Sequence, residues 1–88
     1  MQTKFTRSFA RDLRAIRERT PRAQIQATIE AVEGAESLFD LPQIRRLQGA
    51  EGYYRIRVGN YRIGITFDGE VVTFVRCLHR RDIYRYFP

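Results

Sequence analysis

Apolar and polar residues alternate with the two-residue period of half-buried β-strands in the last third of the chain. The alternation covers residues 53–58, 61–67 and 70–78, and the connections between these runs are Gly59-Asn60 and Asp68-Gly69. Glycine beside asparagine or aspartate in a two-residue connection is typical of tight hairpin turns. The pattern therefore predicts three consecutive antiparallel strands, joined by two hairpin turns.

The first third of the chain instead shows apolar residues spaced by three and four, as on amphipathic helices. The apolar face consists of Phe9, Leu13 and Ile16 in the first helix and of Ile25, Ile29 and Val32 in the second. Thr6 or Ser8 is the candidate N-cap of the first helix, which we expect to end near Arg19. The Thr20-Pro21 pair predicts the start of the second helix, and Gly34 predicts its end. A short connection makes the two helices a helical hairpin.

The remaining segments have weaker patterns. Residues 2–5 are interpreted as a short edge strand, and residues 35–52 as a loop anchored by Leu38, Leu41, Ile44 and Leu47. Residues 79–88 follow the third strand and form a short helical turn or tail. The expected fold class is α+β, with an N-terminal helical hairpin packed on one face of a small, mostly antiparallel, four-stranded sheet. We expect residues 1–88 to form one domain.

The hairpin turns also determine which residues share a face of the predicted sheet. The face that packs on the helices carries Tyr54, Ile56, Val58, Tyr61, Ile63, Ile65, Phe67, Val72, Phe74 and Leu78. The opposite face carries Arg55, Arg57, Arg62, Gly64, Thr66, Thr73, Val75, Cys77 and His79. A two-residue loop places Arg57 directly opposite Arg62, and like charges in this position cost about 0.2–1 kcal/mol. This face therefore suits a polyanion, whereas Cys77 is interpreted as a small apolar filler.

The overall composition also favours an anionic partner. The formal net charge is +6, and the basic residues are fifteen arginines and a single lysine. Guanidinium groups make planar, two-pronged contacts to phosphate and carboxylate. A membrane-spanning helix needs about 18 apolar residues or more, and no apolar run in the chain approaches that length. No signal peptide is visible either, so we expect a cytoplasmic protein. With one cysteine and one histidine, we expect no internal disulfide, metal or cofactor.

The tail adds groups that can transfer protons. His79 and Tyr84 are the candidate proton carriers beside the arginines, and Arg80 lies four residues before Tyr84. Fixed guanidiniums stabilise the charge that develops when a phosphodiester is attacked. RNA cleavage further requires a general base for the 2′-hydroxyl and a general acid for the leaving 5′-oxygen. Either His79 or Tyr84 can serve, and the sequence leaves this choice open.

Two motifs resemble the RelE/ParE superfamily of type II toxins: YRIRVGNYRI over residues 54–63, and HRRDIY over residues 79–84. The resemblance implies a toxin that a cognate antitoxin wraps and inhibits, in a hetero-oligomer, and that is a monomer when alone. In the RelE branch, such a toxin enters the ribosomal A site and cuts mRNA without a metal. By position, the candidate catalytic residues are Arg55, Arg57, Arg62, Arg80, Tyr84 and His79. The candidate RNA-binding residues are Arg55, Arg57, Arg62, Arg80, Arg81 and Arg85.

The resemblance also leaves alternatives. Founding RelE-like members have lysines where this chain has Arg55 and Arg57, which shifts proton transfer to Tyr84 or His79. ParE-like members share the fold and poison DNA gyrase, so a gyrase inhibitor without RNA chemistry is the second reading. A remnant that only binds an antitoxin is the third. Because the chain keeps Tyr84 and the three strand arginines, we favour the mRNA endonuclease.

Overall fold

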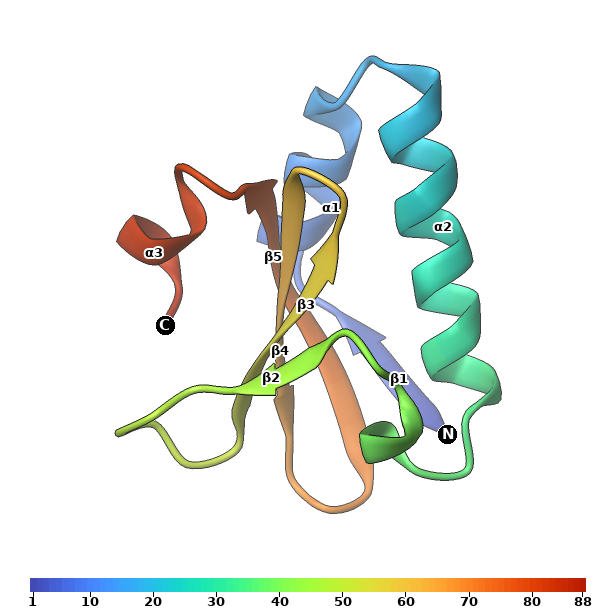
Figure 1. Cartoon of the computed structure of the whole chain (residues 1–88), viewed down its shortest axis with the longest axis vertical. Coiled ribbons are helices and arrows are strands. Elements are labelled where there is room, and N and C mark those ends of the chain that lie inside the picture. The colour runs from blue at the N-terminus through green and yellow to red at the C-terminus, as the bar shows by residue number, and fades with distance from the viewer.

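A five-stranded sheet with the strand order β1-β5-β4-β3-β2 forms the centre of the computed structural model, which describes residues 1–88 (Figure 1). The strands are β1 (Gln2–Phe5), β2 (Ile44–Arg46), β3 (Tyr53–Val58), β4 (Tyr61–Phe67) and β5 (Val71–His79). The helices are α1 (Arg7–Ala15), α2 (Arg19–Gly34), the short 3-10 helix η1 (Leu38–Asp40) and α3 (Ile83–Tyr86). Only the β1–β5 pair is parallel. The predicted α+β class, the edge strand and the two-residue turn at Gly59-Asn60 are confirmed. The second hairpin also forms, but the prediction of a two-residue turn at Asp68-Gly69 was wrong: Phe67 pairs with Val72, because the Asp68 carboxylate accepts the N–H groups of Glu70 and Val71 and lengthens the connection.

The prediction of four strands was wrong, because residues 44–46 form β2 at the edge of the sheet. This strand is three residues long and pairs antiparallel with β3. So short a run shows no measurable alternation, and its hydrogen-bond partners are supplied by a strand that follows later in the chain. The anchoring role predicted for the surrounding leucines is confirmed, since Leu38 and Leu47 are buried and Leu41 packs against the core.

Helix boundaries follow from local capping. Thr6 caps α1: its hydroxyl oxygen accepts the N–H of Phe9 at 3.0 Å and donates to the carbonyl of Val75 at 2.8 Å. The helix ends at Ala15 rather than near Arg19, because Ile16 adopts an extended conformation. Arg22 then donates to the carbonyl of Ile16 at 2.8 Å and covers the C-terminal end of α1.

The second helix begins slightly earlier than predicted. It starts at Arg19, with Glu18 as the N-cap, so Thr20 and Pro21 lie inside its first turn. A proline is tolerated there because the first N–H groups of a helix have no partner within it. Gly34 is the last residue of α2, as predicted. None of the helices combines the length and the hydrophobicity that a membrane-spanning segment needs.

The main hydrophobic core lies between the helical hairpin and one face of the sheet. Figure 1 shows α2 on one side of the sheet and α3 on the other. The buried residues of this core are Phe9, Ile16, Ile25, Ile29, Val32, Leu38, Ile56, Val58, Ile63, Ile65, Val72, Phe74 and Cys77. Burying each large side chain contributes about 1.5–3 kcal/mol. The predicted interior faces of both helices are confirmed, with Leu13 only partly buried.

A β-bulge in β5 changes the predicted faces of its last residues. Ile65 pairs with Phe74 and Gly64 pairs with Arg76, so Val75 is an extra residue between them. Beyond a bulge, the alternation of side chains is inverted relative to the uninterrupted strand. Cys77 therefore points into the main core, where it is 1% exposed, and His79 pairs with Tyr61 on the helix side. The predicted placements of Cys77 and His79 on the arginine-bearing face, and of Leu78 on the helix face, were wrong.

Asp12 attaches α1 to the edge of β5 that β1 leaves uncovered. One carboxylate oxygen accepts the backbone N–H of Cys77 at 3.0 Å and the guanidinium of Arg76 at 2.7 Å. The hydrogen bond to Asp12 raises the pKa of Arg76, because it favours the charged guanidinium. Asp12 is buried, and its carboxylate takes the place of a neighbouring strand as hydrogen-bond acceptor for the backbone of β5. The partners are 64 positions apart along the chain, so no local sequence pattern predicted this contact.

The buried thiol of Cys77 should make the free energy of unfolding fall at alkaline pH. Burial, followed by the negative charge of Asp12, raises the pKa of Cys77 to about 12. The unfolded chain loses this proton above about pH 8.5, whereas the folded protein keeps it, so stability falls as pH rises from there towards 12. In urea unfolding between about pH 8.5 and 10.5, we expect the free energy of unfolding to fall more steeply with pH for the parent protein than for Cys77→Ala, by up to about 1.4 kcal/mol per pH unit. Equal slopes would contradict this assignment.

Candidate functional site

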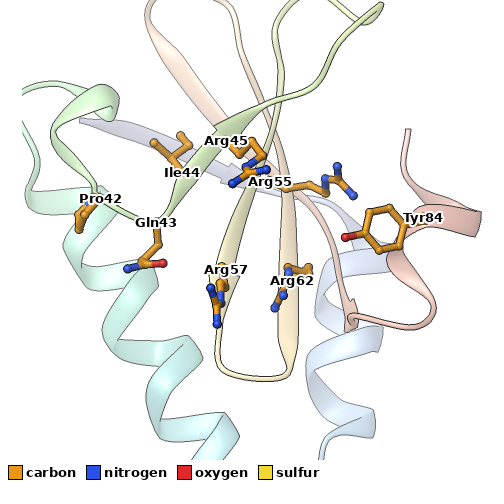
Figure 2. A pocket seen from close by; sticks show the side chains of 8 residues that line it. All are labelled: Pro42, Gln43, Ile44, Arg45, Arg55, Arg57, Arg62 and Tyr84. Carbon is orange, nitrogen blue, oxygen red and sulfur yellow. The ribbon is translucent and has the colours of Figure 1, made fainter.

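A cavity of about 250 Å³ lies between β2, β3, β4 and α3. We call it the arginine pocket, and its lining consists of Pro42, Gln43, Ile44, Arg45, Arg55, Arg57, Arg62 and Tyr84 (Figure 2). All three predicted strand arginines and the predicted tail tyrosine therefore line the same pocket. The strand arginines come from adjacent strands, and Tyr84 comes from α3 on the same side of the sheet.

Two pairs of like charges face each other across the strands of the arginine pocket. Arg57 pairs with Arg62 between β3 and β4, as predicted from the hairpin turn, and Arg45 pairs with Arg55 between β2 and β3. No carboxylate neutralises them, because the chain's single ion pair joins Arg76 to Asp12. Each like-charged pair costs about 0.2–1 kcal/mol. Four unpaired guanidiniums at one cavity form a site for an anion.

Arg62 is the arginine whose guanidinium is fixed by the fold. Its Nη1 donates to the carbonyl of Gly59 at 2.9 Å and to that of Tyr61 at 2.8 Å. Gly59 has a φ of +58°, so the hairpin turn that presents its carbonyl requires a conformation glycine adopts readily. The turn thus orients Arg62 before any ligand arrives, which lowers the entropy lost on binding.

Tyr84 lies at the other end of the pocket. The guanidinium carbon of Arg55 lies 4.4 Å from the centre of the Tyr84 ring, a cation–π contact. Figure 2 shows the Tyr84 hydroxyl directed towards the arginines rather than away from them. The side chain is 67% exposed, so a ligand reaches it without rearrangement of the core. The pocket therefore combines four permanent positive charges with one hydroxyl that can transfer a proton.

His79 lies outside this assembly. Its ring packs edge-on against Tyr61, with centroids 5.6 Å apart, and its Nδ1 accepts the backbone N–H of Arg81 at 3.2 Å. It does not line the arginine pocket. The inversion caused by the bulge at Val75 is the physical reason, since an uninterrupted β5 would place His79 on the arginine face.

The predicted tail arginines are dispersed. Arg80, Arg81 and Arg85 are exposed and do not line the arginine pocket. Arg80 precedes α3, so the expected helical i, i+4 relation to Tyr84 is not formed. Its backbone N–H instead donates to the carbonyl of Asn60 at 2.8 Å, which ties the tail to the β3–β4 turn. These three side chains therefore do not form part of the arginine pocket.

Sequence reasoning missed Arg45 and Gln43, which β2 and the residue before it bring to the pocket. Their segment was interpreted as a loop, so no face was assigned to them. The available signal was the Arg45-Arg46 pair between the apolar residues Ile44 and Leu47. Apolar ends with charged residues between them are compatible with a very short edge strand.

The chain matches known toxins along most of its length. Residues 3–84 match the family model of the ParE toxin of type II toxin-antitoxin systems, parDE. The chain is 44% identical over 89 aligned positions to Toxin RelE3 of Methanocaldococcus jannaschii, and the alignment covers all of both proteins.

Solved structures support the same relationship. A chain of the RelB-RelE antitoxin-toxin complex from Methanococcus jannaschii superposes with a TM-score of 0.80 at 43% identity, covering 97% of this chain and 99% of that one. A chain of the toxin-antitoxin complex RelBE2 from Mycobacterium tuberculosis gives 0.62 at 30% identity, covering 90% and 96%. YafQ from E. coli shares only the fold, with a TM-score of 0.75 at 13% identity over 94% and 97%.

Proposed function

We propose that this chain, which belongs to the ParE/RelE family of toxins of type II toxin-antitoxin systems, is an endoribonuclease. Its proposed substrate is mRNA in the ribosomal A site. The observation that carries the proposal is the arginine pocket. Four arginines without a carboxylate partner and one tyrosine hydroxyl converge there. An anion-binding site that includes a proton-transferring group suits cleavage of a phosphodiester better than binding alone.

The chemistry follows from the groups present. The 2′-oxygen of the RNA forms a bond to phosphorus, the bond from phosphorus to the 5′-oxygen breaks, and the products carry a 2′,3′-cyclic phosphate and a 5′-hydroxyl. Charge develops on the phosphoryl oxygens during the attack. Arg57 and Arg62 face each other at the pocket and stabilise that charge, with Arg62 already held in place by the hairpin turn.

Tyr84 is the group we assign to proton transfer. Arginine stays protonated and glutamine does not titrate, so among the lining residues only Tyr84 can exchange a proton. We assign its phenol to the leaving 5′-oxygen, as general acid, while solvent water takes the proton of the 2′-hydroxyl. His79, the other candidate, packs against Tyr61 on the helix side of the sheet, which favours Tyr84.

The proposal includes the partners. A related toxin occurs in a RelB-RelE antitoxin-toxin complex, and we propose that this chain likewise binds a cognate antitoxin as a hetero-oligomer and is a monomer without it. Residues 1–88 act as one toxin domain. A translated mRNA as target places its action in the cytoplasm, with the ribosome as the second partner.

The test is induction of the chain without an antitoxin, followed by mapping of mRNA 5′ ends. We expect new mRNA 5′ ends within translated reading frames. These ends should not form when an initiation inhibitor keeps ribosomes off the mRNA. Purified ribosomes and mRNA should give the same cuts when EDTA is added at a concentration below that of magnesium. The EDTA then binds transition metals, while enough magnesium remains to maintain the ribosome. Intact mRNA during growth arrest would refute the endonuclease, and absence of any growth defect would favour an antitoxin-binding remnant.

DNA gyrase is the second candidate target, because the matching family model is that of the ParE toxin. A gyrase poison would induce DNA damage signalling and stalled gyrase while translation initially continues. The same induction experiment distinguishes the two targets, since mRNA ends and DNA breaks are measured in the same cells. Cleaved mRNA with intact DNA supports the endonuclease.

Arg57 provides a prediction in which stability and function change in opposite directions. Arg57 is exposed and faces Arg62, so Arg57→Gln removes a like-charge contact and should raise the free energy of unfolding by about 0.2–1 kcal/mol. It should also weaken RNA binding and reduce the slope of log K against log salt by about 0.7, the value for one phosphate of a single strand. Urea unfolding and salt-dependent binding of an RNA oligonucleotide measure both. A variant that loses stability and keeps its salt slope would contradict this role.

A further inference from the structure

We propose that Gly64 and Phe87 are positioning residues for Tyr84, because the Phe87 ring occupies the space above Gly64 and thereby seats α3 against the sheet. The proposal rests on the proposed function, since Tyr84 is the group assigned to proton transfer. Neither residue lines the arginine pocket. Their effect on cleavage is indirect, through the place at which α3 holds the Tyr84 ring.

The tail helix depends on a second, smaller core on the arginine-bearing side of the sheet. α3 contains four residues, too few for a helix to be stable by itself. It is held by Ile83 and Phe87, which are 0% and 3% exposed and pack with Leu47. The partly buried residues around this cluster are Ala50, Tyr53, Val75 and Leu78. Tyr84 itself is exposed, so this cluster rather than its own burial determines its position.

Gly64 is the point on the sheet that admits Phe87. A Cβ atom at position 64 would lie 2.6 Å from Cγ and Cδ2 of the Phe87 ring and 2.8 Å from Cδ1. Real Cβ atoms do not approach other atoms so closely, and Cγ is the base of the ring rather than its mobile end. Any side chain at position 64 therefore displaces Phe87, which also contacts Tyr53 at a centroid distance of 5.6 Å.

The same rung of the sheet connects Gly64 to the site. Gly64 on β4 pairs directly with Arg55 on β3, and Arg55 is the residue whose guanidinium lies over the Tyr84 ring. Phe87 in turn donates its backbone N–H to the carbonyl of Ile83 at 2.9 Å, at the first residue of α3. One rung thus supports both ends of the tail: Phe87 on Gly64, and Tyr84 on Arg55. A shift of the ring at Phe87 is transmitted to Tyr84 over a single helical turn.

The test compares cleavage by Gly64→Ala with that by Gly34→Ala, a matched control at the exposed end of α2 with no neighbouring atom within 4 Å of the added methyl. We expect Gly64→Ala to lower kcat by about 10²-fold, the usual cost of a displacement of about 1 Å at a reacting group, with little change in KM. Phe87→Ala removes the ring atoms that the methyl group would meet, so adding Gly64→Ala to Phe87→Ala should cause no further loss of kcat. Gly34→Ala should be unchanged.

A second readout reports on Tyr84 without any reaction. The protein is labelled with 3-fluorotyrosine, and the ¹⁹F resonance of Tyr84 is assigned from its absence in Tyr84→Phe. We expect this resonance to move in Gly64→Ala, and to lie at the same position in Phe87→Ala with and without Gly64→Ala. If Gly64→Ala does not fold, Phe87→Ala replaces it, since it removes the anchor and leaves the sheet intact.

The outcomes separate the two proposals. If the parent protein does not cleave mRNA, the proposed function fails, and the ¹⁹F shift alone then decides whether Gly64 and Phe87 position Tyr84. If the parent cleaves and Gly64→Ala cleaves equally well, or moves no Tyr84 resonance, the positioning role is overturned. A further fall in kcat when Gly64→Ala is added to Phe87→Ala also overturns it, because the effect of the methyl group would then not depend on the Phe87 ring.

Discussion

Replacing Tyr84 with phenylalanine is expected to lower kcat for mRNA cleavage by about 10²–10⁴-fold, the usual contribution of a positioned general acid. The phenylalanine ring retains the face on which the Arg55 guanidinium rests, so the substitution removes the hydroxyl and little else. Tyr84 is exposed, and its loss should change the free energy of unfolding by no more than about 0.5 kcal/mol. Single-turnover cleavage of mRNA on purified ribosomes measures the effect, and antitoxin binding should be unchanged.

Tyr86 supplies the matched control. It lies in the same short helix and is 52% exposed, but its ring faces Arg76 at 5.5 Å and lies outside the arginine pocket. Tyr86→Phe should therefore cleave like the parent protein. If Tyr84→Phe also cleaves at the parent rate, Tyr84 does not transfer the proton. If both variants are equally impaired, a general defect of α3 rather than proton transfer is responsible.

The largest effect on stability is expected from Asp12→Ala, at about 3–5 kcal/mol of lost unfolding free energy. The substitution leaves the guanidinium of Arg76 without its partner and the backbone N–H of Cys77 without an acceptor, at the point where α1 meets β5. The Asp12 side chain is 7% exposed and that of Arg76 is 20% exposed, so water replaces these contacts poorly. For a domain of this size the loss is a large part of the total stability.

Urea unfolding with a matched variant tests this expectation. Arg11→Ala, an exposed position next to Asp12 on α1, should change stability by no more than about 0.5 kcal/mol. Arg76→Ala should cost less than Asp12→Ala, because Asp12 still accepts the N–H of Cys77 in that variant. A loss in Asp12→Ala no greater than in Arg11→Ala would show that the edge of β5 does not depend on this carboxylate.

Several features of the site were predictable because they depend on neighbours in the sequence. A two-residue turn at Gly59-Asn60 leaves one register for the β3–β4 hairpin, so Arg57 and Arg62 had to face each other. The apolar spacing of the helices likewise identified their buried faces. The error at His79 arose from an extra residue in β5, because a bulge has no marker in composition and reverses every side chain beyond it.

Local patterns were enough to predict the α+β class, both hairpins and the positive face, because turns and periodicity act over a few residues. Which of these groups meet depends instead on how the strands and helices pack. This packing added Arg45 through a strand too short to show a pattern, removed His79 through the bulge, and brought Tyr84 over Arg55 by seating Phe87 on Gly64. These contacts join residues distant along the chain, and their geometry depends on packing that no local pattern records.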